Sequence, residues 1–196
     1  DPKAEAFRNA SSVQHHTFGK SGDVKIGNVA IVDNKSTFSI DSEWGSETFE
    51  MGLLGKHNVS NMAGAITTCL AMGIDMKSLK SAVRDMPSVP GRFESVNCGQ
   101  SFGVIVDYAH TPDGLLNVLI AAREVCGGRV IAIFGCGGDR DKTKRPKMAA
   151  IVAEHADFAI LTSDNPRTES PERILMDMEV GMQRSGKKRD EEYVVI

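Results

Sequence analysis

A short polar motif, Asp164-Asn165-Pro166-Arg167, lies just past the apolar run 158–162. The run predicts a buried strand, so the motif lies where the strand's carboxyl end opens into a loop, the edge at which open α/β sheets bind ligands. An amide, a proline that stiffens the turn and a guanidinium fork suit recognition of a small amino acid that carries a carboxylate. A turn into a helix with a surface arginine is the alternative interpretation.

Two further polar segments follow apolar runs of the same kind. Residues 107–110, Asp-Tyr-Ala-His, follow the run 104–106, and a glycine cluster with Arg140, residues 135–141, follows the run 130–134. Because the carboxyl ends of parallel strands meet at one edge of a sheet, we expect all three segments to line the same rim. Three polar loops on one rigid rim indicate a ligand site.

The residue types in these segments suggest roles. Glycines let backbone N–H groups approach an anion, and Arg140 could hold a carboxylate, although a tight turn without a ligand is the alternative. Asp107 suits a ribose hydroxyl, or else caps the helix that begins near Thr111. His110 either bonds a phosphate or packs against its neighbours.

The first half of the chain holds another candidate site. Residues 55–61, Gly-Lys-His-Asn-Val-Ser-Asn, stand at the entrance of a helix expected over 61–72, which stops at Gly73. Asn58 could cap this helix, but Asn61 three residues later is harder to explain by capping, and a purine contact is the alternative. Arg92 follows a proline-rich segment, 87–90, and could steady a phosphate from a cleft between domains.

The elements that position these residues follow from the apolar pattern. In the second half, three apolar runs alternate with helical stretches, which predicts βαβ units and a Rossmann-like parallel sheet whose strands are covered on both faces. In the first half we expect short strands at 29–32, 36–40 and 48–51, a turn at Asp33-Asn34 and a second helix capped by Asp75. We therefore predict an α/β protein with domains 1–88 and 89–196.

Composition excludes several classes of function. The chain has 196 residues and a net charge of −3, which gives no electrostatic case for nucleic acid or an anionic membrane surface. No apolar stretch approaches the ~20 residues that span a bilayer. Four scattered cysteines without a CxxC pair indicate reduced thiols in a cytoplasmic protein, and no metal site is expected because His15-His16 lacks a spaced third ligand.

Five ordered segments together resemble the Mur ligases, the ATP-dependent amide ligases of peptidoglycan precursor synthesis. They are residues 55–61, 90–94 (Pro-Gly-Arg-Phe-Glu), 106–113, 134–141 and 164–169. The resemblance covers the chain from about residue 50 onward. It implies a Rossmann-like C-terminal domain preceded by the C-terminal part of the family's central ATP-binding α/β domain.

Within the family, these loops are similar to those of the members that add meso-diaminopimelate to UDP-N-acetylmuramoyl-L-alanyl-D-glutamate (UDP-MurNAc-L-Ala-D-Glu). The resemblance implies that diaminopimelate is bound by Arg140, Asp164, Asn165, Pro166 and Arg167. It implies nucleotide contacts at His57, Asn58, Asn61, Arg92, Asp107 and His110. In the implied reaction, ATP and Mg²⁺ form an acyl phosphate that the amine of diaminopimelate attacks, and the arginines position substrates without acting as acids or bases.

The chain also departs from the family pattern. The phosphate-binding GKT loop, the magnesium-binding residues, the carbamylated lysine, the UDP-binding domain and the downstream GKGHE segment do not occur in it. We therefore expect an internal fragment, inactive by itself, of a monomeric cytoplasmic ligase. The alternatives are a non-catalytic scaffold protein of the same fold and another Mur or folylpolyglutamate-type ligase.

Overall fold

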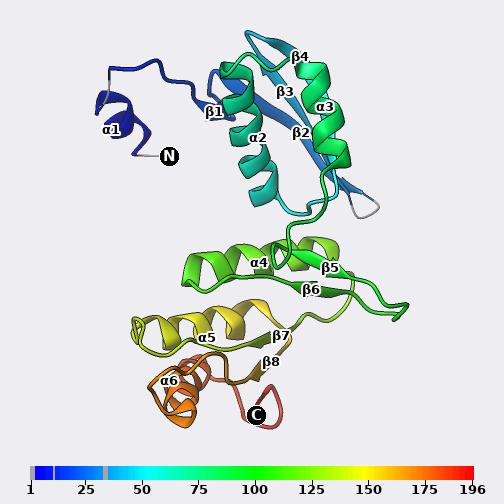
Figure 1. Cartoon of the computed structure of the whole chain (residues 1–196). Helices are drawn as coiled ribbons and strands as arrows, with labels where there is room; N and C mark the ends of the chain where they lie inside the picture. Colours follow the sequence, from blue (N-terminus) through cyan, green and yellow to red (C-terminus); the bar gives the residue numbers. More distant parts are fainter. Residues whose placement is uncertain (1–2, 11, 33–34) are drawn as a thin grey trace. The chain divides into compact units, whose positions relative to one another are not determined.

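The computed structural model describes residues 3–10, 12–32 and 35–196, so the turn expected at Asp33-Asn34 lies outside the described residues. The chain divides into two compact units, Asp1–Val89 and Pro90–Ile196 (Figure 1). None of the described helices is both long and apolar enough to cross a membrane.

The N-terminal unit is built on a four-stranded sheet with the order β1-β2-β3-β4. β1 pairs in parallel with β2, and the other neighbours are antiparallel. The predicted strands are confirmed as parts of longer ones. The bounds are Phe18–Gly19 for β1, Val24–Val32 for β2, Lys35–Ser42 for β3 and Gly45–Met51 for β4. A short helix, α1 (Ala4–Asn9), precedes the sheet and buries none of its residues.

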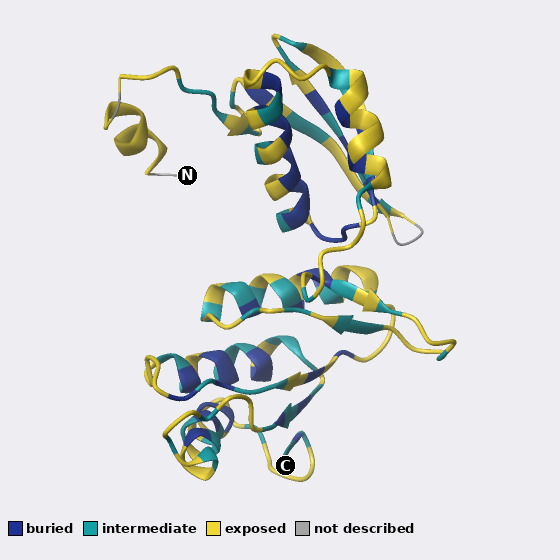
Figure 2. Cartoon of the chain, viewed as in Figure 1, coloured by how far each residue is buried: buried dark blue, intermediate teal, exposed yellow. Residues whose placement is uncertain are grey.

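Two helices, α2 (Lys56–Ala71) and α3 (Met76–Asp85), complete the apolar core of this unit. The rings of Phe38 and Phe49 stack with centroids 5.6 Å apart, and Ile66 of α2 is fully buried with them. The buried face of α2 is the dark stripe in Figure 2. Asp75 caps α3 as predicted, since its carboxylate accepts the backbone N–H of Ser78 at 3.0 Å.

The start of α2 corrects one expectation. The helix begins at Lys56, so residues 56–61 form its first turns and do not merely lead into it. Its N-cap is Gly55, whose φ of 96° lies in the left-handed region that glycine adopts readily.

The C-terminal unit contains the predicted parallel sheet, with the order β7-β8-β9. Its strands are β7 (Ile131–Phe134), β8 (Phe158–Leu161) and β9 (Tyr193–Val195), and the intervening helices are α5 (Lys144–His155) and α6 (Pro171–Arg184). α5 packs against α6 and also against α4 (Pro112–Val125). The α/β prediction is confirmed. Thr111 caps α4 by accepting from Gly114 N, and Ser170 caps α6 by accepting from Arg173 N.

The environment predicted for two strands was wrong. β6 (Val104–Val106) pairs antiparallel with β5 (Glu94–Val96) and lies outside the three-stranded parallel sheet. β7 is covered on one face only, because Ala132 is buried while Ile131 and Ile133 are 54% and 67% exposed. A short apolar run specifies a strand, but it specifies neither the partner nor how many faces are covered.

Candidate functional site

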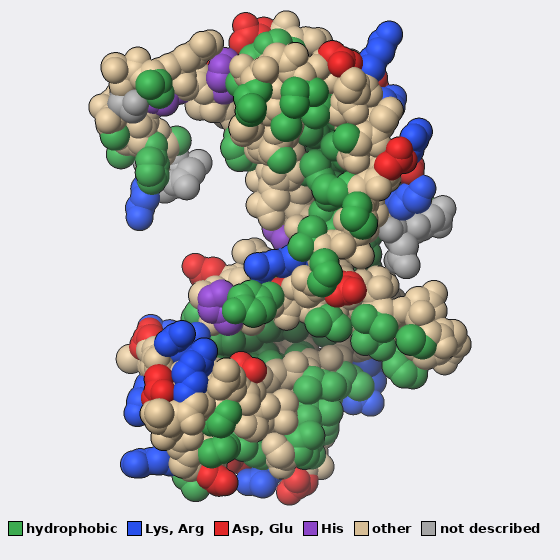
Figure 3. Space-filling view, in the orientation of Figure 1, with side chains coloured by type: hydrophobic (Ala, Val, Ile, Leu, Met, Phe, Trp, Pro, Cys, Tyr) green, Lys and Arg blue, Asp and Glu red, His purple; other side chains and the backbone are tan. Residues whose placement is uncertain are grey.

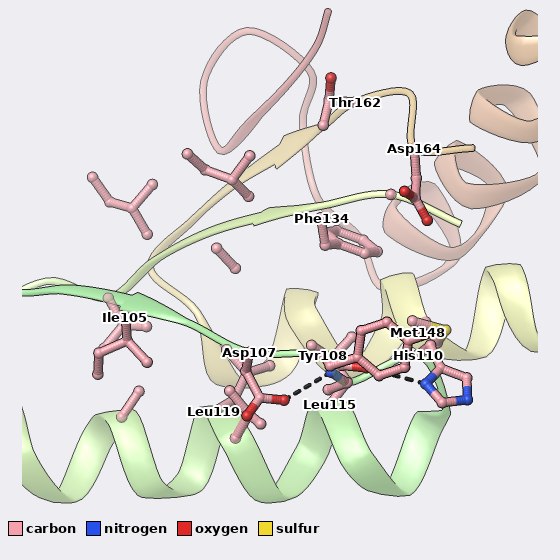
Figure 4. Close-up of a pocket in the computed structure, with 18 of the residues that line it drawn as sticks. Ile105, Asp107, Tyr108, His110, Leu115, Leu119, Phe134, Met148, Thr162 and Asp164 are labelled. Atoms are coloured by element: carbon pink, nitrogen blue, oxygen red, sulfur yellow. Dashed lines mark hydrogen bonds between the residues drawn. The ribbon is translucent and has the colours of Figure 1, made fainter. Parts of the chain in front are cut away.

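A cleft of about 1120 Å³ lies within the C-terminal unit and is lined by all three polar segments (Figure 4). Each segment follows a strand: β6, β7 or β8. The segments contribute Asp107, Tyr108, Ala109 and His110; Gly135, Cys136, Gly137 and Arg140; and Ser163, Asp164 and Arg167. The structure therefore brings the predicted loops to one cleft.

Apolar side chains line much of the rest of the cleft. Ile105 of β6, Leu115 and Leu119 of α4 and Phe134 of β7 line it, together with Met148 of α5. In Figure 4, Asp164 and His110 lie near Phe134, the last residue of β7, and away from Ile105. The cleft thus combines apolar walls with several polar groups, as small-molecule sites do.

The loops after β7 and β8 are in direct contact. The backbone N–H of Gly138 donates to the Asn165 carbonyl at 2.8 Å, and Arg167 Nη1 donates to the Gly138 carbonyl at 2.8 Å. A Cβ on residue 138 would lie 1.8 Å from the Pro166 carbonyl oxygen. At Gly138, close contact between the loops therefore explains the glycine without a bound anion.

The Asp164-Asn165-Pro166-Arg167 motif forms a loop separate from the helix entry. Ser170, not a residue of the motif, caps α6, and the Arg167 side chain lines the cleft. Asn165 Oδ1 accepts the Arg167 backbone N–H at 3.3 Å, and Arg167 has a left-handed φ of 52°. The helix-entry interpretation does not describe this loop.

Arg140 and Cys136 occupy the loop after β7 with different environments. Arg140 is exposed, lines the cleft, and donates from Nη1 to the Asp139 carbonyl at 3.0 Å. Burial raises the pKa of the Cys136 thiol to about 11. That thiol stays protonated at neutral pH, which makes it unsuited to act as a nucleophile.

The Asp107 carboxylate ties two backbone segments together. Its Oδ2 accepts Phe93 N–H at 2.8 Å, and its Oδ1 accepts Ala109 N–H at 2.7 Å. Because Thr111 caps α4, the capping role considered for Asp107 was wrong.

An open aromatic and cationic surface adjoins Asp107. The Arg92 guanidinium lies 5.0 Å from the centroid of the exposed Tyr108 ring, and the His110 ring meets the same ring edge-on at 5.1 Å. His110 Nδ1 lies 3.1 Å from the Tyr108 carbonyl oxygen. A flat ring for stacking, a guanidinium for phosphate and a carboxylate for ribose fit a nucleotide.

The remaining predicted contacts belong to α2 of the N-terminal unit. Asn58 is buried and its Nδ2 donates to the Leu54 carbonyl at 2.8 Å, so this side chain fixes the entry to the helix and is not its N-cap. His57 is half-buried, and Asn61 is exposed on the same helix. The structure describes these three residues within the N-terminal unit.

A charged cluster that was not predicted from the sequence contacts the two loops. Arg145 of α5 is fully buried and forms ion pairs with Glu169 and Asp177. A signal was present, because Arg145 shares helical spacing with Met148, Ala149 and Val152 on the buried face of α5. Figure 3 shows Lys and Arg side chains interleaved with Asp and Glu on the surface of the C-terminal unit.

The fold and the site together define a class of protein. Residues 91–195 match the family described as "Mur ligase, glutamate ligase domain", and residues 1–69 match "Mur ligase middle domain". The chain belongs to the Mur ligase family.

Individual members of the family show which ligases the sequence is similar to. The chain is 44% identical, over its whole length, to the UDP-N-acetylmuramoyl-L-alanyl-D-glutamate–2,6-diaminopimelate ligase of Syntrophomonas wolfei. It is 53% identical over 71% of its length to the ligase of the same name from Fusobacterium nucleatum, and covers 29% of that protein. The chain spans about 40% of the length of the Syntrophomonas relative.

Solved structures agree with this family. A structure of a ligase of the same name aligns with 97% of the chain, covering 39% of that protein, at 36% identity and a TM-score of 0.57. MurF from Acinetobacter baumannii aligns with all of the chain, covering 40% of its own, at 18% identity and a TM-score of 0.71. Folylpolyglutamate synthase from Mycobacterium tuberculosis aligns with 98% of the chain, covering 41% of its own, at 18% identity and 0.73. The last two likenesses establish the fold alone.

Proposed function

We propose that this chain is part of an ATP-dependent ligase that joins meso-diaminopimelate to UDP-MurNAc-L-Ala-D-Glu. The names of the most similar relatives support this activity, as does the family to which the chain belongs. Because the chain spans only part of those relatives, the activity is assigned to the longer protein. In that protein, residues 1–88 are proposed to contact the nucleotide, and residues 89–196 are proposed to bind the amino acid and to supply further nucleotide contacts.

The observation that carries the proposal is the pairing of two arginine-bearing loops at one cleft. Arg140 and Arg167 both line it, and the loops that carry them are hydrogen-bonded through Gly138. Diaminopimelate has an amino-acid centre at each end, so the centre that does not react still presents a carboxylate and an amine. Guanidinium groups suit that carboxylate, and Asp164, which lines the cleft, offers an acceptor for the amine; Asn165 and Pro166 are proposed as further contacts from the same loop.

Nucleotide contacts are proposed in each unit separately. Arg92, Asp107 and His110 would hold ATP at the surface around Tyr108, and His57, Asn58 and Asn61 of α2 are proposed as further contacts. ATP supplies the phosphoryl group that activates the D-glutamate carboxyl group. Among the residues described, no group of three His, Cys, Asp or Glu side chains could hold a metal ion. We therefore assign Mg²⁺ no ligands in this chain and no step.

In this proposal the chain contributes positioning and electrostatics. Arg140 and Arg167 hold diaminopimelate by its remote end so that its reacting amine faces the activated carboxyl group. We propose a monomeric, cytoplasmic enzyme whose partners are its small-molecule substrates.

The test is ADP release by the full-length protein that carries this chain. It is measured with UDP-MurNAc-L-Ala-D-Glu and either meso-diaminopimelate or L-lysine, which lacks the second carboxylate. We expect turnover with diaminopimelate and little with lysine. Turnover with lysine alone would retain the ligase and reject the substrate assignment. Inactivity of the folded protein with both would favour a non-catalytic scaffold.

A further inference from the structure

The buried guanidinium of Arg145 is an unusual feature of the C-terminal unit. Among the described residues, Arg145 is the one charged side chain classed as buried, with no exposed surface. It stands in the first turn of α5, where the helix dipole disfavours a positive charge. A charge in this position persists only when it is well paired, so its partners show what it does.

Two carboxylates from different segments pair with Arg145. Its Nη1 and Nη2 donate to Glu169 Oε2 and Oε1 at 3.1 and 2.8 Å, a two-point contact, and Nη1 also donates to Asp177 Oδ2 at 2.8 Å. Glu169 lies in the loop after β8, whereas Asp177 lies on α6. The Nε atom is buried without a hydrogen-bond partner in the part of the chain that is described. Arg145 thus joins α5 both to a site loop and to a helix.

Glu169 also reaches the other site loop. Its Oε1 accepts the Asp139 backbone N–H at 2.7 Å, and the Asp139 carboxylate in turn accepts Thr168 Oγ1 at 2.8 Å. The two loops are therefore joined in both directions. The Glu169 side chain of one loop binds the backbone of the other, and the Asp139 side chain of the second loop binds the Thr168 hydroxyl of the first. Hydrogen bonds from Arg145, and then from Asp139 N–H, lower the pKa of Glu169 to about 2, so the carboxylate is ionised at neutral pH.

The ends of this connection adjoin the two arginines of the proposed site. Arg140 follows Asp139 directly, and Thr168 follows Arg167 directly. Asp139 and Arg167 both have a φ of 52°, a left-handed backbone conformation that residues other than glycine rarely adopt. Such a backbone persists when the surrounding bonds determine it, and here those bonds pass through Glu169 and Arg145.

We propose that Arg145 is a positioning residue that sets specificity at the carboxylate site. Acting through Glu169, it fixes the two loops so that Arg140 and Arg167 converge on the remote carboxylate of the substrate. This inference rests on the proposed function. It assigns Arg145 no contact with substrate, and it predicts an effect on diaminopimelate recognition that leaves the nucleotide site unchanged.

The test compares Glu169→Gln with Asp177→Asn in the full-length protein. Both variants remove one negative partner of Arg145 and keep the shape of the side chain, but only Glu169 touches a site loop. We measure the KM for diaminopimelate, ATP and the UDP-linked dipeptide, the rate with L-lysine, and the thermal unfolding midpoint. Glu169→Gln should raise the KM for diaminopimelate by about tenfold or more, because small displacements of positioning groups carry large penalties. The same variant should reduce the preference of the enzyme for diaminopimelate over L-lysine, and it should leave the KM for ATP unchanged.

Asp177→Asn should lower the thermal unfolding midpoint about as much as Glu169→Gln does, but it should not change the KM for diaminopimelate. Two outcomes would overturn the positioning role. One is the same KM for diaminopimelate in both variants, and the other is a rise in the KM for ATP as large as the rise in the KM for diaminopimelate. If Glu169→Gln does not fold, Arg145→Lys replaces it: one ammonium cannot reproduce the two-point contact, so the same selective rise in KM is expected. Inactivity of the unmodified protein with diaminopimelate would instead reject the proposed function.

Discussion

The two units of this chain fix their candidate site residues in different ways. In the N-terminal unit, His57, Asn58 and Asn61 are carried by a regular helix whose buried face packs against Phe38, Phe49 and their neighbours. In the C-terminal unit, Arg140 and Arg167 stand on irregular loops held by backbone contacts and the Arg145 ion pairs. Apolar packing therefore positions the first set, and polar bonds between distant segments position the second.

The largest effect should come from the apolar core of the N-terminal unit. Ile66→Ala removes a buried side chain of α2, and we expect a loss of about 2–5 kcal/mol of unfolding free energy in that unit. Hydrogen exchange of peptides from both units measures it, and peptides from the C-terminal unit should keep their protection. The matched control is Met72→Ala at the exposed end of the same helix, which should change stability by about 0.5 kcal/mol or less. Equal loss of protection in both units would show that they unfold as one.

A smaller effect should come from the loop contact of the C-terminal unit. Gly138→Ala places a Cβ 1.8 Å from the Pro166 carbonyl oxygen, so the loops must separate, at a cost of about 1–3 kcal/mol. Exchange of the 135–141 and 164–169 peptides should rise while α2 is unaffected.

Gly127→Ala is the control for this variant. A Cβ at residue 127 meets nothing within 4 Å, so stability should change by about 0.5 kcal/mol or less. If the two glycine variants behave alike, close contact between the loops is not what requires Gly138.

The smallest effect concerns acid stability. The pKa of Glu169 is lowered from 4.5 to about 2, chiefly by Arg145, so its stabilising contribution is complete above about pH 4.5 and is lost as pH falls toward 2. Unfolding midpoints measured between pH 6 and pH 2 should therefore fall less steeply in Glu169→Gln than in the unmodified chain.

Glu172→Gln serves as the comparison in that titration. The pKa of Glu172 is lowered chiefly by the Ser170 hydroxyl, without help from Arg145, and the change in slope should be smaller. If Glu172→Gln flattens the acid profile as much as Glu169→Gln does, the Arg145 pair does not dominate acid stability.

The contrast between the units also explains what the sequence could predict. Asp75 could be predicted as a helix cap because capping depends on residues three positions apart. The parallel sheet followed from the alternation of apolar runs and helices. The role of Arg145 did not follow: its helical spacing could place it on the buried face of α5, but its partners lie 24 and 32 residues away.

The strand partners were less predictable for a related reason. Val104–Val106 is apolar enough for either sheet, and its antiparallel pairing with Glu94–Val96 depends on a segment that shows no strand pattern. The candidate residues themselves could be named from their positions after strands. The hydrogen bonds that orient these residues could not be predicted, because each of the two loops depends on the other for its conformation.

The uncovered face of β7 has a practical consequence for work with this chain alone. In the described part of the chain, β7 forms a ladder with β8 on one side only, and Ile131 and Ile133 are exposed where they line the cleft. A short apolar strand with an open ladder is a template for pairing with another copy, and such pairing leads to aggregation. Purified material should therefore be kept dilute.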